Sequence, residues 1–140
     1  MQPTLEELER RIVKCKEWMW MPGMRVAAED GLMLSYRLSE DRHPSYPDEY
    51  DWPHDLGLRR PDLSDSATLG CLMNLIEQKH ITIYGGPVEA VYLSPGIDTD
   101  RSVMWEVAIM FYSGLQHEIS EGKSKAEALV IALEADIVTN

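Results

Sequence analysis

Apolar residues that recur every three or four positions predict three helices. The first follows a capping-box pair, Thr4 and Glu7, and covers residues 5–17. The last begins at a pair with the same spacing, Ser124 and Glu127. In both pairs the hydroxyl and the carboxylate satisfy backbone N–H groups that the first turn of a helix leaves free, so each pair marks a helix start.

The middle helix is predicted to lie at the centre of the core. Asp65 is its N-cap, and the buried stripe consists of Leu69, Leu72, Met73 and Ile76. Cys71 lies among these apolar residues, nearly two turns from the free amides of the helix start, so it is predicted to be a core residue and not a nucleophile. His80 follows this helix and is expected to interact with its carbonyl end.

Alternation of apolar and polar residues predicts an N-terminal hairpin over residues 24–38. A two-residue loop would place apolar and polar side chains on the same face. A three-residue loop over residues 29–31 instead pairs Val26 with Leu34 and gives Gly31 the left-handed position that such loops favour.

The second half of the chain predicts four more strands, at residues 81–84, 88–93, 103–111 and 115–120. The third of these is apolar on both faces apart from Glu106 and is therefore expected to be central. A two-residue turn, Ser113 and Gly114, leads into the fourth. The predicted order is α-β-β-α-β-β-β-β-α, a single α+β domain over residues 1–140 with three helices packed on an antiparallel sheet.

Residues 39–61 form a long loop with four prolines and many charges. Loops of this length inside a compact domain are uncommon and are often functional. Its aromatic and acidic side chains predict a protein-binding surface, since Tyr and Trp make strong contacts at interfaces; these residues are Tyr46, Asp48, Glu49, Tyr50, Asp51 and Trp52. The aromatic side chains could instead fold back over the core as a flap.

The same loop contains residue types that bind divalent metals, His43, His54 and Asp55. The two histidines do not have helical spacing, and adjacent residues such as His54 and Asp55 rarely reach one ion. We therefore predict no metal site and no cofactor. A small metal-dependent enzyme that uses this loop is kept as an alternative.

Charge narrows the classes of partner. The chain has 13 Lys and Arg against 24 Asp and Glu, a net charge of −11 and a pI near 4.7. Such a chain repels phosphate backbones, so nucleic acid is not an expected partner. Its N-terminus is polar and no apolar stretch is long enough to cross a membrane, which predicts a cytoplasmic protein.

Common catalytic and nucleotide-binding motifs are absent from the sequence, including Gly-x-x-x-x-Gly-Lys, Gly-x-Ser-x-Gly and His-Glu-x-x-His. The chemistry-bearing residues form no acid–base set by spacing. We therefore predict no catalytic residues and a protein that is not an enzyme.

Four segments carry a resemblance to known proteins: "LEELERRIVKCKEWMWMPGM", "PDLSDSATLGCL", "WEVAIMFY" and "GKSKAEALVIALEA". Together they resemble a group of small uncharacterised proteins of bacteriophages and prophages. This resemblance implies a phage-related origin and the cytoplasm of the host cell, and it transfers no functional residue. The C-terminal strands and helix also look like the ends of HicB-type antitoxins and of double-stranded-RNA-binding domains, at the level of fold only.

The sequence thus predicts a non-enzymatic, phage-related accessory protein that binds a host or phage protein through an acidic surface bearing aromatic residues. A HicB-like antitoxin or regulator is a further alternative.

Overall fold

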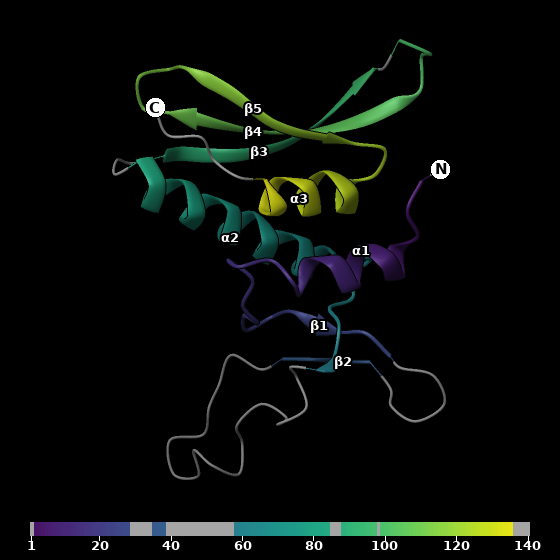
Figure 1. Ribbon diagram of the computed structural model, residues 1–140. Helices are drawn as coiled ribbons and strands as arrows, with labels where there is room; N and C mark the ends of the chain where they lie inside the picture. The colour runs from purple at the N-terminus through teal and green to yellow at the C-terminus, as the bar shows by residue number, and fades with distance from the viewer. Residues whose placement is uncertain (1, 29–34, 39–57, 85–87, 98, 136–140) are drawn as a thin grey trace.

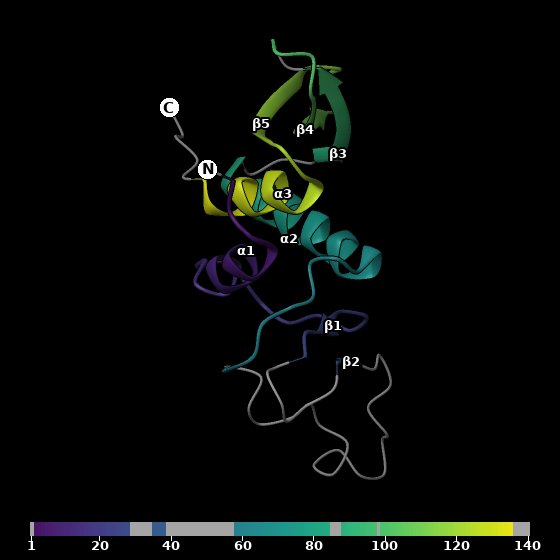
Figure 2. The ribbon, with the colours of Figure 1, turned by 90° about the vertical axis from the view of Figure 1, so that its right-hand side faces the viewer.

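The computed structural model describes residues 2–28, 35–38, 58–84, 88–97 and 99–135. In these residues the chain is an α+β protein with three helices and a three-stranded antiparallel sheet. The sheet lies at one end, α2 and α3 pack beneath it, α1 packs beneath those helices, and a small β-ladder lies at the other end (Figures 1 and 2). The prediction of an α+β fold is confirmed. The prediction of four strands after the second helix was wrong, because the described residues there form three.

The helices and strands occur in the order α1 (Leu5–Ile12), β1 (Arg25–Val26), β2 (Tyr36–Arg37), α2 (Ser66–Tyr84), β3 (Val88–Ile97), β4 (Val103–Phe111), β5 (Gln116–Gly122) and α3 (Lys125–Glu134). The predicted N-terminal hairpin does not join the main sheet. Instead β1 and β2 pair with each other, and β3, β4 and β5 form a separate sheet in that order.

All three predicted helix starts are confirmed. The hydroxyls of Thr4 and Ser124 accept hydrogen bonds from the backbone N–H groups three residues later, each at 3.1 Å. The Asp65 carboxylate accepts from the backbone N–H of Thr68 at 3.0 Å and from its hydroxyl at 2.9 Å. Polar side chains that satisfy free N–H groups thus fix where each helix begins.

The predicted ends of the first two helices were wrong. Helix α1 ends at Ile12 and not at residue 17, because the backbone N–H groups of Lys14 and Cys15 bond to carbonyls three residues back and tighten the chain into turns. Helix α2 continues through residues 81–84, which were predicted to be a strand. The β-branched Ile and Thr residues of this segment favour a strand locally, but the segment continues a long helix that packs against β3 and α3, and tertiary context commonly overrides local propensity.

The N-terminal strands pair with a register that differs by two residues from the prediction. Val26 pairs with Tyr36 and not with Leu34, while residues 29–34 lie outside the described part of the chain. The other side of β1 is also paired, because the backbone N–H of Ala27 bonds to the carbonyl of Arg60 at 2.9 Å. Residues 60 and 61, which were predicted to be loop, therefore pair with β1, and the guanidinium of the buried Arg59 donates to the carbonyl of Ala27 at 2.8 Å.

Strand β4 is central, as predicted, with β3 and β5 antiparallel on its two sides. The turn into β5 has three residues and not two, since the N–H of Phe111 bonds to the carbonyl of Leu115 at 2.9 Å. Gly114 occupies its left-handed position at φ +89°, where a glycine has no Cβ penalty.

The core lies on one side of this sheet. Val107 and Ile109 of β4 are fully buried against α2 and α3, together with Leu129 and Leu133 of α3. Leu8 and Ile12 of α1, with Met24 and Leu72, extend the same apolar cluster towards the small ladder. No helix covers the opposite side of the sheet in the described part of the chain (Figures 1 and 2).

Candidate functional site

The uncovered side of the sheet, here called the open face, is the main candidate site. Residues directly opposite one another in an antiparallel ladder share a face. The alternate positions of β4 that point away from Val107 and Ile109, with their partners on β3 and β5, therefore define the open face: Ala90, Tyr92, Ser94, Gly96, Met104, Glu106, Ala108, Met110, Gln116, Glu118 and Glu121.

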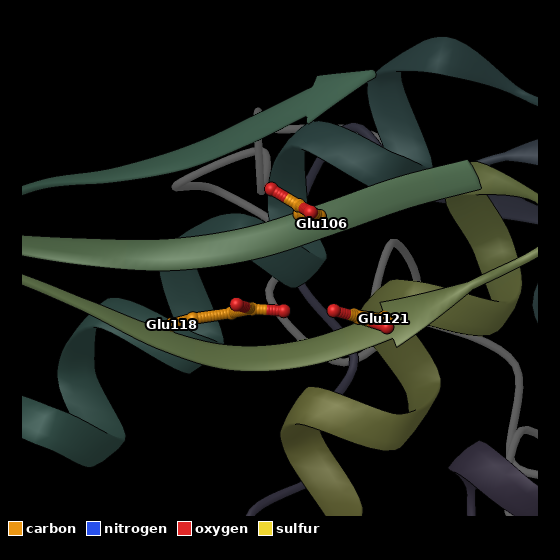
Figure 3. A group of neighbouring side chains, drawn as sticks. All are labelled: Glu106, Glu118 and Glu121. Carbon is orange, nitrogen blue, oxygen red and sulfur yellow. The ribbon is translucent and has the colours of Figure 1, made fainter. Parts of the chain in front are cut away.

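Three glutamates form the centre of the open face. Glu106 comes from β4 and Glu118 and Glu121 come from β5. The carboxylates of Glu118 and Glu121 are directed towards each other, and Glu106 lies on the neighbouring strand (Figure 3). Carboxylate oxygens of the three residues all lie within 4.8 Å of one another. Among the described residues, no lysine or arginine forms an ion pair with any of them.

A β-bulge brings Glu118 and Glu121 to the same face. Val107 pairs with Ser120 and Ala108 pairs with Glu118, so Ile119 is the extra residue. In a regular strand, residues three apart point to opposite faces, but an inserted residue reverses the alternation. Glu121 then lies beside Glu106, and Glu118 lies beside Ala108 on the same side.

Like charge perturbs this cluster. A hydrogen bond with Glu121, some burial and the negative charges of Glu121 and Glu106 raise the pKa of Glu118 to about 7. A protonated Glu118 carboxyl can donate to the Glu121 carboxylate and so lowers the repulsion between them. A cation placed among the three carboxylates would have the same effect without a proton.

The surroundings of the carboxylates combine apolar and aromatic side chains. Tyr92 is 41% exposed and lies next to Ala108 in the ladder. Met104 and Met110 lie at the two ends of the β4 segment of the face and are partly exposed. Methionine and tyrosine side chains adapt well to partner surfaces. The open face is therefore acidic at its centre and apolar around it.

The sequence of the sheet is depleted of positive charge. Strands β3, β4 and β5 contain four glutamates and no lysine or arginine, and Arg101 is the single lysine or arginine between Lys79 and Lys123. This depletion, with Glu106 alone among apolar residues of its strand, was the signal available in the sequence. The sequence gives no signal for the bulge, because strict alternation places Glu118 and Glu121 on opposite faces.

The three carboxylates are also the described residues that could hold a metal ion. Their oxygens are ligands that Mg²⁺ and Ca²⁺ prefer. These ions usually require six or more ligands with defined geometry, and Glu118 and Glu121 are exposed at the surface. The arrangement is thus suited to a hydrated or transient cation more than to an enclosed metal centre.

The residues predicted to bind a partner or a metal cannot be placed. Tyr46, Asp48, Glu49, Tyr50, Asp51 and Trp52, and the metal candidates His43, His54 and Asp55, all lie in residues 39–57, outside the described part of the chain. Their roles remain predictions.

Two other sequence-based interpretations are corrected. Cys71 packs against the core, as predicted, but is only partly buried, and its Sγ lies 3.7 Å from the carbonyl oxygen of Pro22, beside a pocket of about 620 Å³. It lies beside the buried stripe of α2, which runs through Leu72 and Ile76. His80 is inside α2 and 1% exposed, and burial lowers its pKa, so it does not act at the helix end.

A second pocket, of about 280 Å³, lies where α1 and α3 end, and four of its lining residues are basic, Arg11, Lys14, Lys16 and Lys79. The Lys79 ammonium donates to the carbonyl oxygens of Leu133 and Ala135 at 2.7 and 2.6 Å. Cations at the carbonyl ends of helices stabilise the fold. We therefore assign these contacts to the packing of the three helices.

Comparison with protein-family models, with curated proteins and with solved structures finds no match to this chain. The resemblances to phage proteins and to antitoxins thus remain predictions. In the part of the chain that the structure describes, no helix has the length and apolar character needed to span a membrane.

Proposed function

We propose that this protein is a non-enzymatic, phage-related accessory protein whose function is to bind another protein through the open face of β3, β4 and β5. The observation that supports this proposal is the sheet itself, which is covered by helices on one side and carries Tyr92, Met104 and Met110 around an acidic centre on the other. An uncovered surface that joins apolar and charged side chains is typical of an interaction site.

The edges of the sheet favour binding to its face over addition of a strand. On one edge, β3 contains Pro95, which has no N–H to donate, and a register irregularity between Val88 and Ala90. On the other edge, the bulge at Ile119 interrupts β5. Both features hinder strand pairing, so a partner would contact side chains of the open face.

The position of the glutamates supports binding more than catalysis. Glu118 and Glu121 are exposed to water, whereas acid–base chemistry by carboxylates generally needs a site from which water is excluded. The partner would be a host or phage protein, and the net charge of −11 makes nucleic acid a poor ligand.

The predicted aromatic and acidic residues of the 39–61 loop would form a second contact surface. Strand β2, which precedes this loop, lies at the end of the molecule opposite the sheet (Figure 1). Contacts through the loop and contacts through the open face can therefore be tested with separate variants.

The test compares protein capture by variants that change one surface at a time. Tyr92→Ala combined with Met110→Ala shortens two side chains of the open face, and Met19→Ala, at a residue that is 54% exposed elsewhere, is the control. We expect the wild type and Met19→Ala to capture the same host or phage protein. The double variant should capture about tenfold less of it or even less, because truncating contact residues weakens an interface. Equal recovery by all three would contradict the proposal.

A further inference from the structure

The open face allows a more specific inference about the partner, which rests on the proposed function. We infer that the partner inserts an arginine side chain among Glu106, Glu118 and Glu121, and that apolar residues on either side of this arginine pack on Tyr92 and Met110.

The first step of the argument is charge complementarity. Three carboxylates are gathered on a surface whose strands contain no lysine or arginine, and in the described part of the chain none of the three has a basic partner. Protein interfaces match charge of opposite sign, which also speeds association and excludes partners of like charge. A basic partner segment is therefore the occupant that this surface fits.

The second step concerns the shape of the cation. Carboxylate oxygens from two strands lie within 4.8 Å of one another, so one planar guanidinium can donate to more than one of them at once. Arginine donates five N–H groups in a rigid fork, whereas the lysine ammonium is a compact point charge. The geometry favours arginine over lysine.

The third step concerns space. Glu106 extends over Gly96 of β3, where an added Cβ would lie 3.1 Å from Glu106 Oε1. The absence of a side chain at this position lets Glu106 lie flat against the sheet. At the centre of the face the small residue Ala108 separates Tyr92 from Glu118. The carboxylates are thus reached from the open side of the sheet.

The experiment uses three synthetic nonapeptides with blocked ends, which differ only at the central residue: arginine, lysine or citrulline, with leucines on both sides. Citrulline has nearly the shape of arginine and no charge. Binding to the full chain at low salt is followed by the chemical shifts of backbone amides. We expect the arginine peptide to bind about tenfold more tightly than the citrulline peptide, equal to about 1.4 kcal/mol, with the lysine peptide between them.

Variants of the protein locate the effect. Glu118→Gln combined with Glu121→Gln should reduce the affinity for the arginine peptide to that for the citrulline peptide. Glu7→Gln, which removes the charge of an exposed carboxylate on α1, should leave the affinity unchanged. When the arginine peptide is added to the wild type, the backbone amide chemical shifts of Glu118, Glu121 and Ala108 should change most. Because glutamine keeps the size of glutamate and removes repulsion, the double variant is expected to fold.

The remaining outcomes separate this inference from the proposed function. Equal affinity for the arginine and citrulline peptides overturns the inference. If both peptides then lose binding in Tyr92→Ala with Met110→Ala, the open face is still a protein-binding surface and the proposed function stands. If Mg²⁺ or Ca²⁺ at micromolar concentration saturates the cluster and displaces the arginine peptide, the site belongs to a cation and the inference is overturned.

Discussion

Acidic side chains have opposite surroundings at the two ends of this molecule. On the helical side, Glu9 lies 2.9 Å from Arg60 Nε and accepts the backbone N–H of Leu63 at 2.9 Å, and Asp65 accepts both guanidinium N–H groups of Arg37. On the sheet, the carboxylates of Glu106, Glu118 and Glu121 lie beside one another, and no described cation pairs with them. Charges of opposite sign meet in one region, and charges of like sign meet in the other.

The two arrangements differ in what they contribute to folding. The pairs on the helical side join segments far apart in sequence, such as α1 with residues 60–63 and β2 with the start of α2. Removing one member leaves a partly buried group without its partner. Like charges on the sheet lower stability, so the fold gives no reason for them. A site that costs stability is typical of a binding function, which supports the proposal for the open face.

The comparison would be tested most strongly at Glu9, which is 4% exposed. Glu9→Ala removes the acceptor of the Leu63 N–H and the nearest carboxylate partner of Arg60, which keeps its contacts with Glu6 and with the Ala28 carbonyl. The Leu63 N–H then remains without this acceptor in a poorly hydrated site. We expect a loss of about 3 kcal/mol in the free energy of unfolding, measured by urea denaturation. Glu7→Ala on the exposed side of the same helix is the control, with an expected change of about 0.5 kcal/mol or less. Among the described residues the Glu7 carboxylate makes no capping-box bond, and the bond from its backbone N–H to Thr4 is kept in the variant. Equal effects would show that the Glu9 contacts do not hold α1 to the chain.

A smaller loss is expected at Asp65, where the carboxylate is both a helix cap and an ion-pair partner. Asp65→Ala should lower the free energy of unfolding by about 2 kcal/mol at neutral pH, mainly through loss of the cap on Thr68. Hydrogen bonds from Arg37 and Thr68 hold the pKa of Asp65 well below its ordinary value. A lowered carboxyl pKa stabilises the fold above the unfolded value, and this gain is lost as pH falls below about 4.

The pH dependence tests whether these contacts favour the charged form of Asp65. Between about pH 4 and pH 2 the wild type should lose stability more steeply than Asp65→Ala, because only the wild type has this carboxylate to protonate. Parallel curves for the two proteins would show that the hydrogen bonds from Arg37 and Thr68 do not favour the charged form of Asp65 in solution.

Helix starts could be predicted from the sequence because their cause is local. Thr4, Asp65 and Ser124 each act within three residues of their own position, and all three act as expected. The central strand was also predictable, because a long apolar run at residues 103–111 favours a strand with neighbours on both of its edges. Features that depend on contacts between distant segments could not be predicted in this way. Strand β1 is also paired with residues 60–62, and residues 81–84 continue a helix that packs as a whole against β3 and α3.

The candidate site illustrates the same limit. A binding surface of acidic and aromatic residues was predicted from composition, and the prediction placed it in the 39–61 loop. On the described residues this character is found on the open face. Glu118 and Glu121 share that face because one extra residue, Ile119, is accommodated in β5. A bulge depends on how two strands pair, and the sequence of β5 alone contains no sign of it.

The smallest expected effect is a gain in stability at Glu118. The raised pKa of this carboxyl, about 7, lies above the ordinary value of 4.5 expected in the unfolded chain. Between these values the folded protein binds more protons than the unfolded one, so this group makes stability fall as pH rises. Its facing ionisable groups are Glu106, Glu121 and, across Ala108, the phenol of Tyr92.

Glu118→Gln should therefore fold as stably as the wild type near pH 5 and be more stable by a few tenths of a kcal/mol near pH 8, since exposed charges are screened by water. Urea denaturation at the two pH values measures the difference for both proteins. Other groups with raised pKa values, such as Glu9, contribute equally to both and cancel. Glu7→Gln should keep the pH dependence of the wild type. If Glu118→Gln keeps it as well, the three carboxylates do not repel one another in solution, and the contrast between the sheet and the helical side would not hold.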